Sequence, residues 1–161
     1  MPLRSDWSAA RCPIARSLDV VGDPWVLLIL RDALLGSRRY EQFRANLGIA
    51  DNVLSRRLAA MVDAGLLRQV PYRAEHRTHQ EYHITEAGSD LLPVVHALAQ
   101  WGNKHRAAPD GASLGIVHRP CGKPSSTPDV CSHCGRIMRP EDVDWHRPWR
   151  SPDLTPLVGA E

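Results

Sequence analysis

The order of short amphipathic segments between residues 38 and 85 constrains the fold more than any other feature. Apolar residues recur at helical spacing in residues 39–47 and again in residues 51–64, with a tight turn at residues 48–50 between them. Residues 66–72 and 80–84 have strand character, and they flank a polar stretch, residues 73–79, that we expect to be a loop. Helix, turn, helix and two-stranded hairpin is the order of a winged helix-turn-helix. We therefore predict a mainly α fold with a small β wing.

Further helices are expected on both sides of this unit. A short helix is predicted over residues 12–21, and a nearly all-apolar one over residues 25–35, where Asp23 caps the start and Pro24 takes the first helical position. A helix that is apolar on almost every face belongs in the centre of a core. A long helix is expected over residues 86–105, with a bend or a break near Leu92 because Pro93 follows.

The distribution of charge points to nucleic acid as the partner. The whole chain carries a formal charge of only +2. Residues 36–78, however, hold eight Arg against four acidic residues, so this segment is locally +4. A local basic surface is what contact with the phosphates of double-stranded DNA requires.

The helix at residues 51–64 is the expected reader of bases, because a B-DNA major groove admits one α-helix and is read mainly near its N-terminus. The face opposite its apolar stripe carries Asn52 and Arg56, with Ser55 and Arg57 beside them. Asn can pair with adenine and Arg with guanine, each through two hydrogen bonds. The alternative is that Arg56 and Arg57 are simply a solvated helix face. The predicted phosphate contacts are Arg38, Arg39 and Arg44 before this helix and Arg73 and Arg77 in the wing.

Several motifs resemble the HxlR family of bacterial regulators over residues 11–106. They are Cys12-Pro13, Gly22-Asp23-x-Trp25, Leu54-Ser55-x-Arg57-Leu58, Tyr82-x-Ile84-Thr85-Glu86-x-Gly88 and Trp101-Gly102. The resemblance implies a homodimer, joined through the N-terminal segment and the long last helix, that binds an inverted or near-inverted repeat. These two regions are therefore expected to be dimerisation helices that flank the winged domain. The wing departs from the expected pattern because it is rich in histidine, with His76, His79 and His83.

Cys12 is a candidate redox sensor, because a Cys at this position senses oxidants or electrophiles in some members of that family. The positive end of a helix dipole favours thiolate, and Arg11 and Arg16 lie close in sequence. The alternative is a half-buried thiol in the dimer interface that does not respond to oxidants. An oxidant or a small molecule is therefore the expected class of effector.

The segment after residue 109 has a different composition, rich in Pro and holding the other three Cys, so we expect domains at residues 1–109 and 110–161. His118, Cys121, Cys131 and Cys134 have the spacing of a closed tetrahedral zinc site, and a Gly follows Cys121 and Cys134. His133 is a less favoured substitute for His118. Alternatives are an empty thiol cluster or a disulfide between Cys131 and Cys134. We expect this short Cys/His-rich tail to be loosely ordered beyond Pro140.

Other classes of protein find little support. The N-terminal segment lacks an apolar run of signal-peptide length, and the longest apolar run is too short to span a bilayer, so a cytoplasmic chain without membrane contact is expected. There is no phosphate-binding Gly-rich loop, HExxH motif or nucleophile elbow, so we do not expect an enzyme. The sequence predicts a DNA-binding transcriptional regulator. The alternative is a protein-interaction module that uses a winged-helix scaffold and a structural zinc tail.

Overall fold

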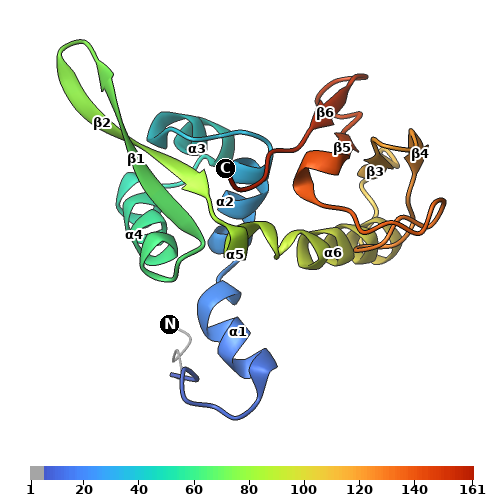
Figure 1. Cartoon of the computed structure of the whole chain (residues 1–161), viewed down its shortest axis with the longest axis horizontal. Coiled ribbons are helices and arrows are strands. Elements are labelled where there is room, and N and C mark those ends of the chain that lie inside the picture. The colour runs from blue at the N-terminus through green and yellow to red at the C-terminus, as the bar shows by residue number, and fades with distance from the viewer. Residues whose placement is uncertain (1–5) are drawn as a thin grey trace.

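The computed structural model describes residues 6–161, and its first part is the predicted winged helix-turn-helix (Figure 1). Helices come first in the chain and a two-stranded hairpin follows, so the predicted fold class is confirmed. The elements of this part are α1 (Pro13–Val21), α2 (Pro24–Leu34), α3 (Tyr40–Leu47), α4 (Asp51–Asp63), β1 (Leu67–Ala74) and β2 (Arg77–Ile84).

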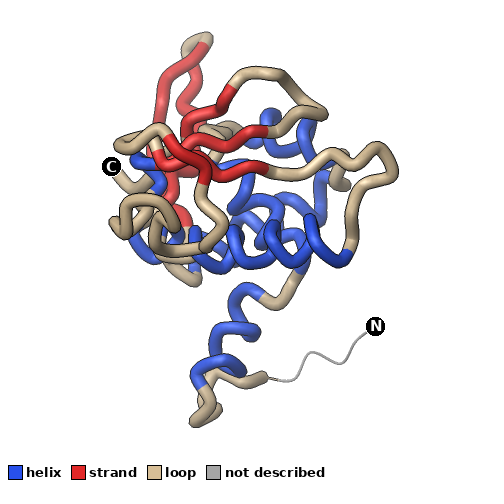
Figure 2. Tube along the Cα trace, turned by 90° about the vertical axis from the view of Figure 1, so that its right-hand side faces the viewer, coloured by secondary structure: helices blue, strands red, loops and turns tan. Residues whose placement is uncertain are grey.

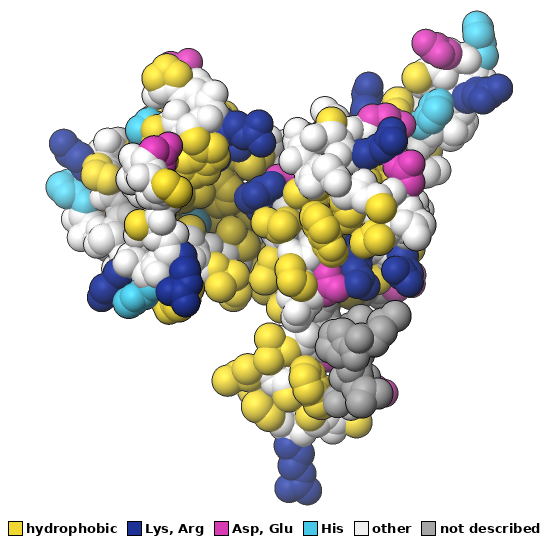
Figure 3. All heavy atoms as spheres, turned by 180° about the vertical axis from the view of Figure 1, so that it is seen from behind, with side chains coloured by type: hydrophobic (Ala, Val, Ile, Leu, Met, Phe, Trp, Pro, Cys, Tyr) yellow, Lys and Arg dark blue, Asp and Glu magenta, His cyan; other side chains and the backbone are white. Residues whose placement is uncertain are grey.

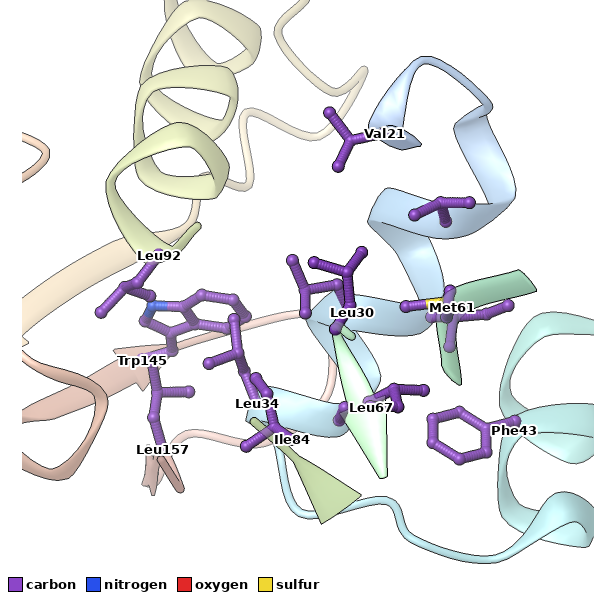
Figure 4. Close-up of a cluster of buried hydrophobic side chains, with 14 of the residues drawn as sticks. Val21, Leu30, Leu34, Phe43, Met61, Leu67, Ile84, Leu92, Trp145 and Leu157 are labelled. Carbon is purple, nitrogen blue, oxygen red and sulfur yellow. The ribbon is translucent and has the colours of Figure 1, made fainter. Parts of the chain in front are cut away.

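Helix α2 forms the centre of the core, as its apolar sequence predicts. Its N-terminus is capped by Asp23, whose carboxylate accepts the backbone N–H of Trp25 at 2.9 Å. Ile29, Leu30 and Leu34 are completely buried. Apolar side chains from α3, α4 and the hairpin gather around them, which fixes α4 against the body of the domain (Figure 4).

The wing is longer than the sequence predicts. Strands β1 and β2 pair antiparallel from Leu67 opposite Ile84 to Ala74 opposite Arg77. Only Glu75 and His76 form the turn, and both have positive φ, 48° and 66°. The prediction of a loop over residues 73–79 was therefore wrong. The outer half of the hairpin projects from the body (Figure 1), and residues 73–79 contain a single apolar residue, Ala74, so no alternation of apolar and polar residues marks that stretch as strand.

The long C-terminal helix of the first part is broken where Pro93 predicts. A short helix, α5 (Glu86–Ser89), precedes α6 (Leu92–His105). The Thr85 hydroxyl oxygen caps α5 by accepting the Gly88 N–H at 3.1 Å, and the same hydroxyl group donates to the Leu66 carbonyl at 3.0 Å. Gly88 is required here because a Cβ at this position would lie 2.4 Å from the Leu66 oxygen. The motif that follows the wing thus joins the hairpin to the helices.

Residues 110–161 form a small antiparallel sheet of four strands, in the order β4-β3-β5-β6. The prediction of loose order beyond Pro140 was wrong, because Val143, Trp145 and Leu157 are buried. In residues 143–146 buried and half-buried positions alternate, as in a strand. The run is only four residues long and has Pro residues near both ends, so its sequence does not indicate a strand. The elements are β3 (Gly115–His118), β4 (Lys123–Pro124), the 3-10 helix η1 (Pro140–Asp142), β5 (Val143–His146) and β6 (Leu154–Pro156).

The two parts of the chain share one hydrophobic cluster. Trp145 and Leu157 of the sheet lie beside Leu92 of α6 and Leu34 of α2 (Figure 4). A backbone hydrogen bond adds to this contact, since the Val158 N–H, just after β6, donates to the Leu34 carbonyl at 2.8 Å. The division into domains at residue 109 stays a prediction, and the packing joins the two parts tightly.

His96 is a buried polar link between α6 and the C-terminal sheet. Its side chain is completely buried, and its Nδ1–H donates to the Pro128 carbonyl at 2.8 Å. Its Nε2 accepts the indole N–H of Trp145 at 3.0 Å. Both ring nitrogens are therefore used by the neutral form, and a second ring proton would face another N–H. Burial lowers the pKa of His96, against a smaller raising effect of the Pro128 hydrogen bond.

This arrangement predicts that acid destabilises the fold through His96. The folded protein resists protonation of the ring, whereas the unfolded chain binds a proton near the ordinary value of 6.5. The free energy of unfolding should therefore be greatest above that value and fall below it, by at most about 1.4 kcal/mol per pH unit. Urea unfolding of wild type and His96→Gln at pH 7.5 and 5.5 measures this contribution. An equal pH dependence in the two proteins would contradict it.

Among residues 6–161, no helix combines the length and the apolar composition that crossing a lipid bilayer requires.

Candidate nucleic-acid interface and metal centre

The outward face of α4 carries the predicted base-reading side chains. Leu54, Leu58 and Met61 are buried against the core, so Asn52, Ser55 and Arg56 are left exposed on the other side. This division follows from the helical period of 3.6 residues. Asn52 and Arg56 lie one helical turn apart and share a face.

Tyr40 of α3 holds the N-terminus of α4, a role that the sequence reasoning missed. Its hydroxyl donates to the Asp51 carbonyl at 3.0 Å, and the Ser55 hydroxyl donates to the Tyr40 oxygen at 3.3 Å. The tyrosine spans the turn of the helix-turn-helix and fixes the angle between the two helices. The sequence pattern assigns Tyr40 to the apolar stripe of α3, and this assignment gives no sign that its hydroxyl forms hydrogen bonds to α4.

Four of the predicted DNA-contacting arginines make ion pairs within the chain, and three of these pairs lie at the surface. The pairs are Arg38–Glu161 at 2.5 Å, Arg39–Glu81 at 3.1 Å, Arg44–Asp51 at 2.7 Å and Arg57–Asp23 at 2.5 Å. Surface pairs contribute only about 0–1 kcal/mol to stability. A DNA phosphate can therefore replace the carboxylate at Arg38, Arg39 or Arg44 at little cost.

Arg57 differs from the other three arginines because it faces the body of the domain. Its side chain is 22% exposed, and its partner Asp23 is the residue that caps α2. The ion pair thus joins the Leu-Ser-x-Arg-Leu motif of α4 to the Gly-Asp-x-Trp motif before α2. In this structure Arg57 orients α4, whereas the exposed Arg56 makes no ion pair with any described residue.

The wing presents Arg73 and Arg77 at its tip, where neither makes an ion pair with a described residue. They flank the turn, with Arg73 opposite Thr78 and Arg77 opposite Ala74. Two of the three wing histidines contact other side chains of the wing. His79 stacks on Tyr72 at 5.5 Å between ring centroids, and the buried His83 ring contacts Glu81 at 3.0 Å.

Two exposed apolar stripes lie on α1 and α6. On α1 the stripe contains Ile14 and Leu18, and on α6 it contains Val94, Leu98 and Trp101. Helix α1 stands away from the body in both ribbon views (Figures 1 and 2), and hydrophobic side chains cover much of its surface (Figure 3). The side chains of Ile14, Leu98 and Trp101 are 69%, 51% and 54% exposed. Exposed apolar stripes of this kind are typical of surfaces that contact another protein.

Cys12 lies at the N-cap of α1, as the sequence predicts, and its thiol is exposed and free. The guanidinium of Arg16, one of the two arginines near it in sequence, is engaged by backbone carbonyls rather than by the thiol. It donates to the Ala10 and Arg11 carbonyls, at 2.7 and 2.9 Å.

The four predicted metal ligands come together in the C-terminal part. The ligand atoms of His118, Cys121, Cys131 and Cys134 all lie within 4.8 Å of one another. His118 Nδ1 is 3.4 Å from the Cys121 sulfur and 3.3 Å from the Cys134 sulfur, and the Cys121 and Cys131 sulfurs are 3.8 Å apart. Tetrahedral zinc, with bonds of about 2.0–2.3 Å, needs neighbouring ligand atoms about 3.5–3.8 Å apart. The three separations given above lie within about 0.2 Å of that spacing, so the residues fit zinc with small adjustments, and His133 is not in the cluster.

The local backbone explains how the cluster forms. His118 ends β3, and the Gly122 N–H turns back to its carbonyl at 2.8 Å. Gly122 and Gly135 have φ of +67° and +74°, the left-handed region that permits each tight knuckle. The Arg136 backbone N–H lowers the pKa of Cys134 to about 6, and burial raises that of Cys121. All three thiols are free rather than disulfide-bonded in this structure.

Comparison with known proteins identifies the chain. Residues 20–110 match the family described as HxlR-like helix-turn-helix. The chain belongs to the HxlR family. It is 40% identical over 130 residues to Rv3095, an uncharacterized HTH-type transcriptional regulator of Mycobacterium tuberculosis. The aligned residues make up 81% of this chain and 82% of that protein.

Solved structures extend the resemblance of this HxlR-family chain. The structure of PA1607, a candidate transcription factor, superposes with a TM-score of 0.69 at 40% identity and covers 86% of this chain and 96% of that one. The redox regulator HypR, in its reduced form, superposes at 0.55 with 27% identity and covers 59% of this chain and 94% of that one. The chain is a DNA-binding transcriptional regulator by family. The 130 residues matched to Rv3095 include at least 20 beyond residue 110, so that relative shares part of the C-terminal segment.

Proposed function

We propose that the chain is a homodimeric, sequence-specific regulator of transcription that binds an inverted-repeat operator, and we assign it no catalytic activity. The observation that carries the proposal is the outward face of α4. Asn52 and Arg56 are exposed there, and Arg56 makes no ion pair with a described residue, while the opposite face is anchored in the core. These are the side chains that recognise adenine and guanine in a major groove.

The proposed phosphate contacts surround this helix. Arg38, Arg39 and Arg44 lie before α4, and Arg73 and Arg77 lie on the projecting wing. Their charges make affinity fall with rising salt, because phosphate binding releases counterions from DNA. We propose that Ser55 contacts the DNA backbone or a base edge, and that Arg57 supports Arg56 through its pair with Asp23 rather than by reaching a base.

Replacing Arg56 with Ala tests base reading directly. Loss of one bidentate base contact costs about 1–3 kcal/mol per half-site, so a dimer loses about 2–6 kcal/mol at its specific site. Binding to random DNA should change little. Titration of an operator fragment and of random DNA with wild type, Arg56→Ala and the matched control Arg139→Ala, an exposed arginine of the C-terminal part, measures both terms. Equal losses on the two DNAs would show that Arg56 contacts only phosphate.

The alternative function, a protein-interaction module, is separated by the same titrations. A regulator that reads sequence prefers operator fragments over random DNA in rising salt. An interaction module would not bind DNA even at low salt.

We further propose that an oxidant acts through Cys12. The exposed thiol lies beside the α1 stripe, and the related HypR is a redox regulator. Peroxide treatment should lower operator affinity of wild type at least about tenfold if the oxidised thiol disturbs the dimer by roughly 1.4 kcal/mol. Cys12→Ala should not respond. An equal response in the two proteins would assign the effect to the other thiols.

A further inference from the structure

Two adjoining cavities lie where the winged domain meets the C-terminal sheet, and they share Leu114 and Trp149 as lining residues. The larger, about 570 Å³, is mainly apolar and opens at the end of α6 and the segment that follows it. The smaller, about 260 Å³, lies between the end of α2, α3 and the loop after β5. In Figure 3 a hollow with hydrophobic side chains separates the two lobes, and Lys or Arg side chains stand at its margin.

The smaller cavity carries an excess of positive charge. Arg31, Arg147 and Arg150 line it together with a single acidic residue, Asp32. Arg31 and Asp32 pair with each other at 2.7 Å, so their charges cancel. Arg147 and Arg150 make no ion pair with any described residue, and they leave the cavity with two unbalanced guanidinium groups.

Arg147 in particular has an unmet need for an acceptor. Its Nη2 donates to the Thr155 hydroxyl at 3.3 Å, but its Nε is buried and has no hydrogen-bond partner. Burial lowers its pKa, and the charges of Arg150 and Arg31 lower it further. Asp32 is 3% exposed and its Oδ2 also lacks a partner. Buried polar groups without partners are rare in native proteins and call for a ligand or a water molecule.

The two compartments together define the chemistry of an occupant. Cavities of about 300–1,000 Å³ with apolar walls and a few convergent polar groups are typical of small-molecule sites. The cationic end requires an anion, and guanidinium groups match a carboxylate. The apolar end is lined by Leu114 and by Trp149, whose side chain is exposed, and it suits a flat hydrophobic body.

We propose that this cleft binds an aromatic carboxylate, with the carboxylate at Arg147 and Arg150 and the ring against Trp149 and Leu114. Such a ligand contacts α2 of the winged domain and the loop after β5 at once. If the ligand binds one relative position of α2 and the loop after β5 more tightly than another, it shifts the protein toward the position that it binds more tightly. The inference does not rest on DNA binding, since the cleft is tested without DNA.

The test compares 1-naphthoate with its neutral isostere 1-naphthamide, by calorimetric titration of the full chain. Charge-assisted hydrogen bonds predict that the naphthoate binds at least about tenfold more tightly than the amide. Arg150→Gln, at an exposed side chain that leaves the core intact, should remove about tenfold of the naphthoate affinity and leave the amide unchanged. Trp149→Ala should weaken both.

Arg139→Gln is the matched control, an exposed arginine outside the cleft, and it should bind 1-naphthoate like wild type. Three results would overturn the proposal: no heat of binding with 1-naphthoate, equal affinity for the acid and the amide, or an undiminished affinity in Arg150→Gln. A failure of this kind would leave the DNA-binding proposal unaffected.

Discussion

Leu98→Glu should dissociate the proposed dimer and remove operator binding with it. Leu98 is 51% exposed in the middle of the α6 stripe, between Val94 and Trp101. Burial of a Leu side chain contributes about 1.5–3 kcal/mol, and a twofold interface contains each residue twice, so the loss is about 3–6 kcal/mol per dimer. Sedimentation of the variant should give a monomer at concentrations where wild type is a dimer.

The companion control is Lys104→Glu, which changes the charge of an exposed α6 residue outside the stripe. It should remain dimeric and fold like wild type. Circular dichroism of Leu98→Glu should also match wild type, because the side chain lies outside the core. If Leu98→Glu sediments as a dimer, the α6 stripe is not part of the interface.

We propose that the Cys/His cluster holds a structural zinc ion, and on that proposal Cys131→Ser should abolish zinc binding and destabilise the C-terminal sheet. Cys131 is the buried member of the cluster, and its backbone N–H donates to the Arg136 carbonyl at 2.8 Å. Structural zinc sites contribute about 10–16 kcal/mol in isolated fingers. The sheet here also has an apolar core around Trp145, so we expect a smaller loss, at least about 3 kcal/mol in the free energy of unfolding.

Cys12→Ser is the control for the metal site, because it removes an exposed thiol far from the cluster in sequence. It should retain about one zinc per chain when purified under reducing conditions. Elemental analysis decides the matter for wild type. A zinc content below about half an equivalent would contradict the proposed site.

The sequence was informative wherever short-range patterns determine structure. The outward face of α4 follows from the spacing of Leu54, Leu58 and Met61, and it is exposed as predicted. The break before α6 follows from Pro93, and the metal cluster from the spacing of its ligands. Each of these depends on local periodicity or local backbone chemistry.

Features that depend on distant contacts were not predictable in this way. The ion pair between Arg57 and Asp23 joins two segments that are 34 residues apart in sequence, and the local sequence of either segment does not indicate its partner. The chain beyond Pro140 is ordered because Trp145 is buried against α6 and its indole N–H donates a hydrogen bond to His96. The outer wing forms strand because its two backbones pair, although residues 73–79 are polar apart from Ala74.

The most direct test of the central claim is the footprint of the purified chain on genomic fragments that it selects. Two protected half-sites of related, inverted sequence, about 10–10.5 base pairs or a multiple apart, are the expected result. Arg56→Ala should lose both half-sites together. A single unpaired footprint, or selection of fragments no more alike than random DNA, would contradict recognition by a dimer through α4.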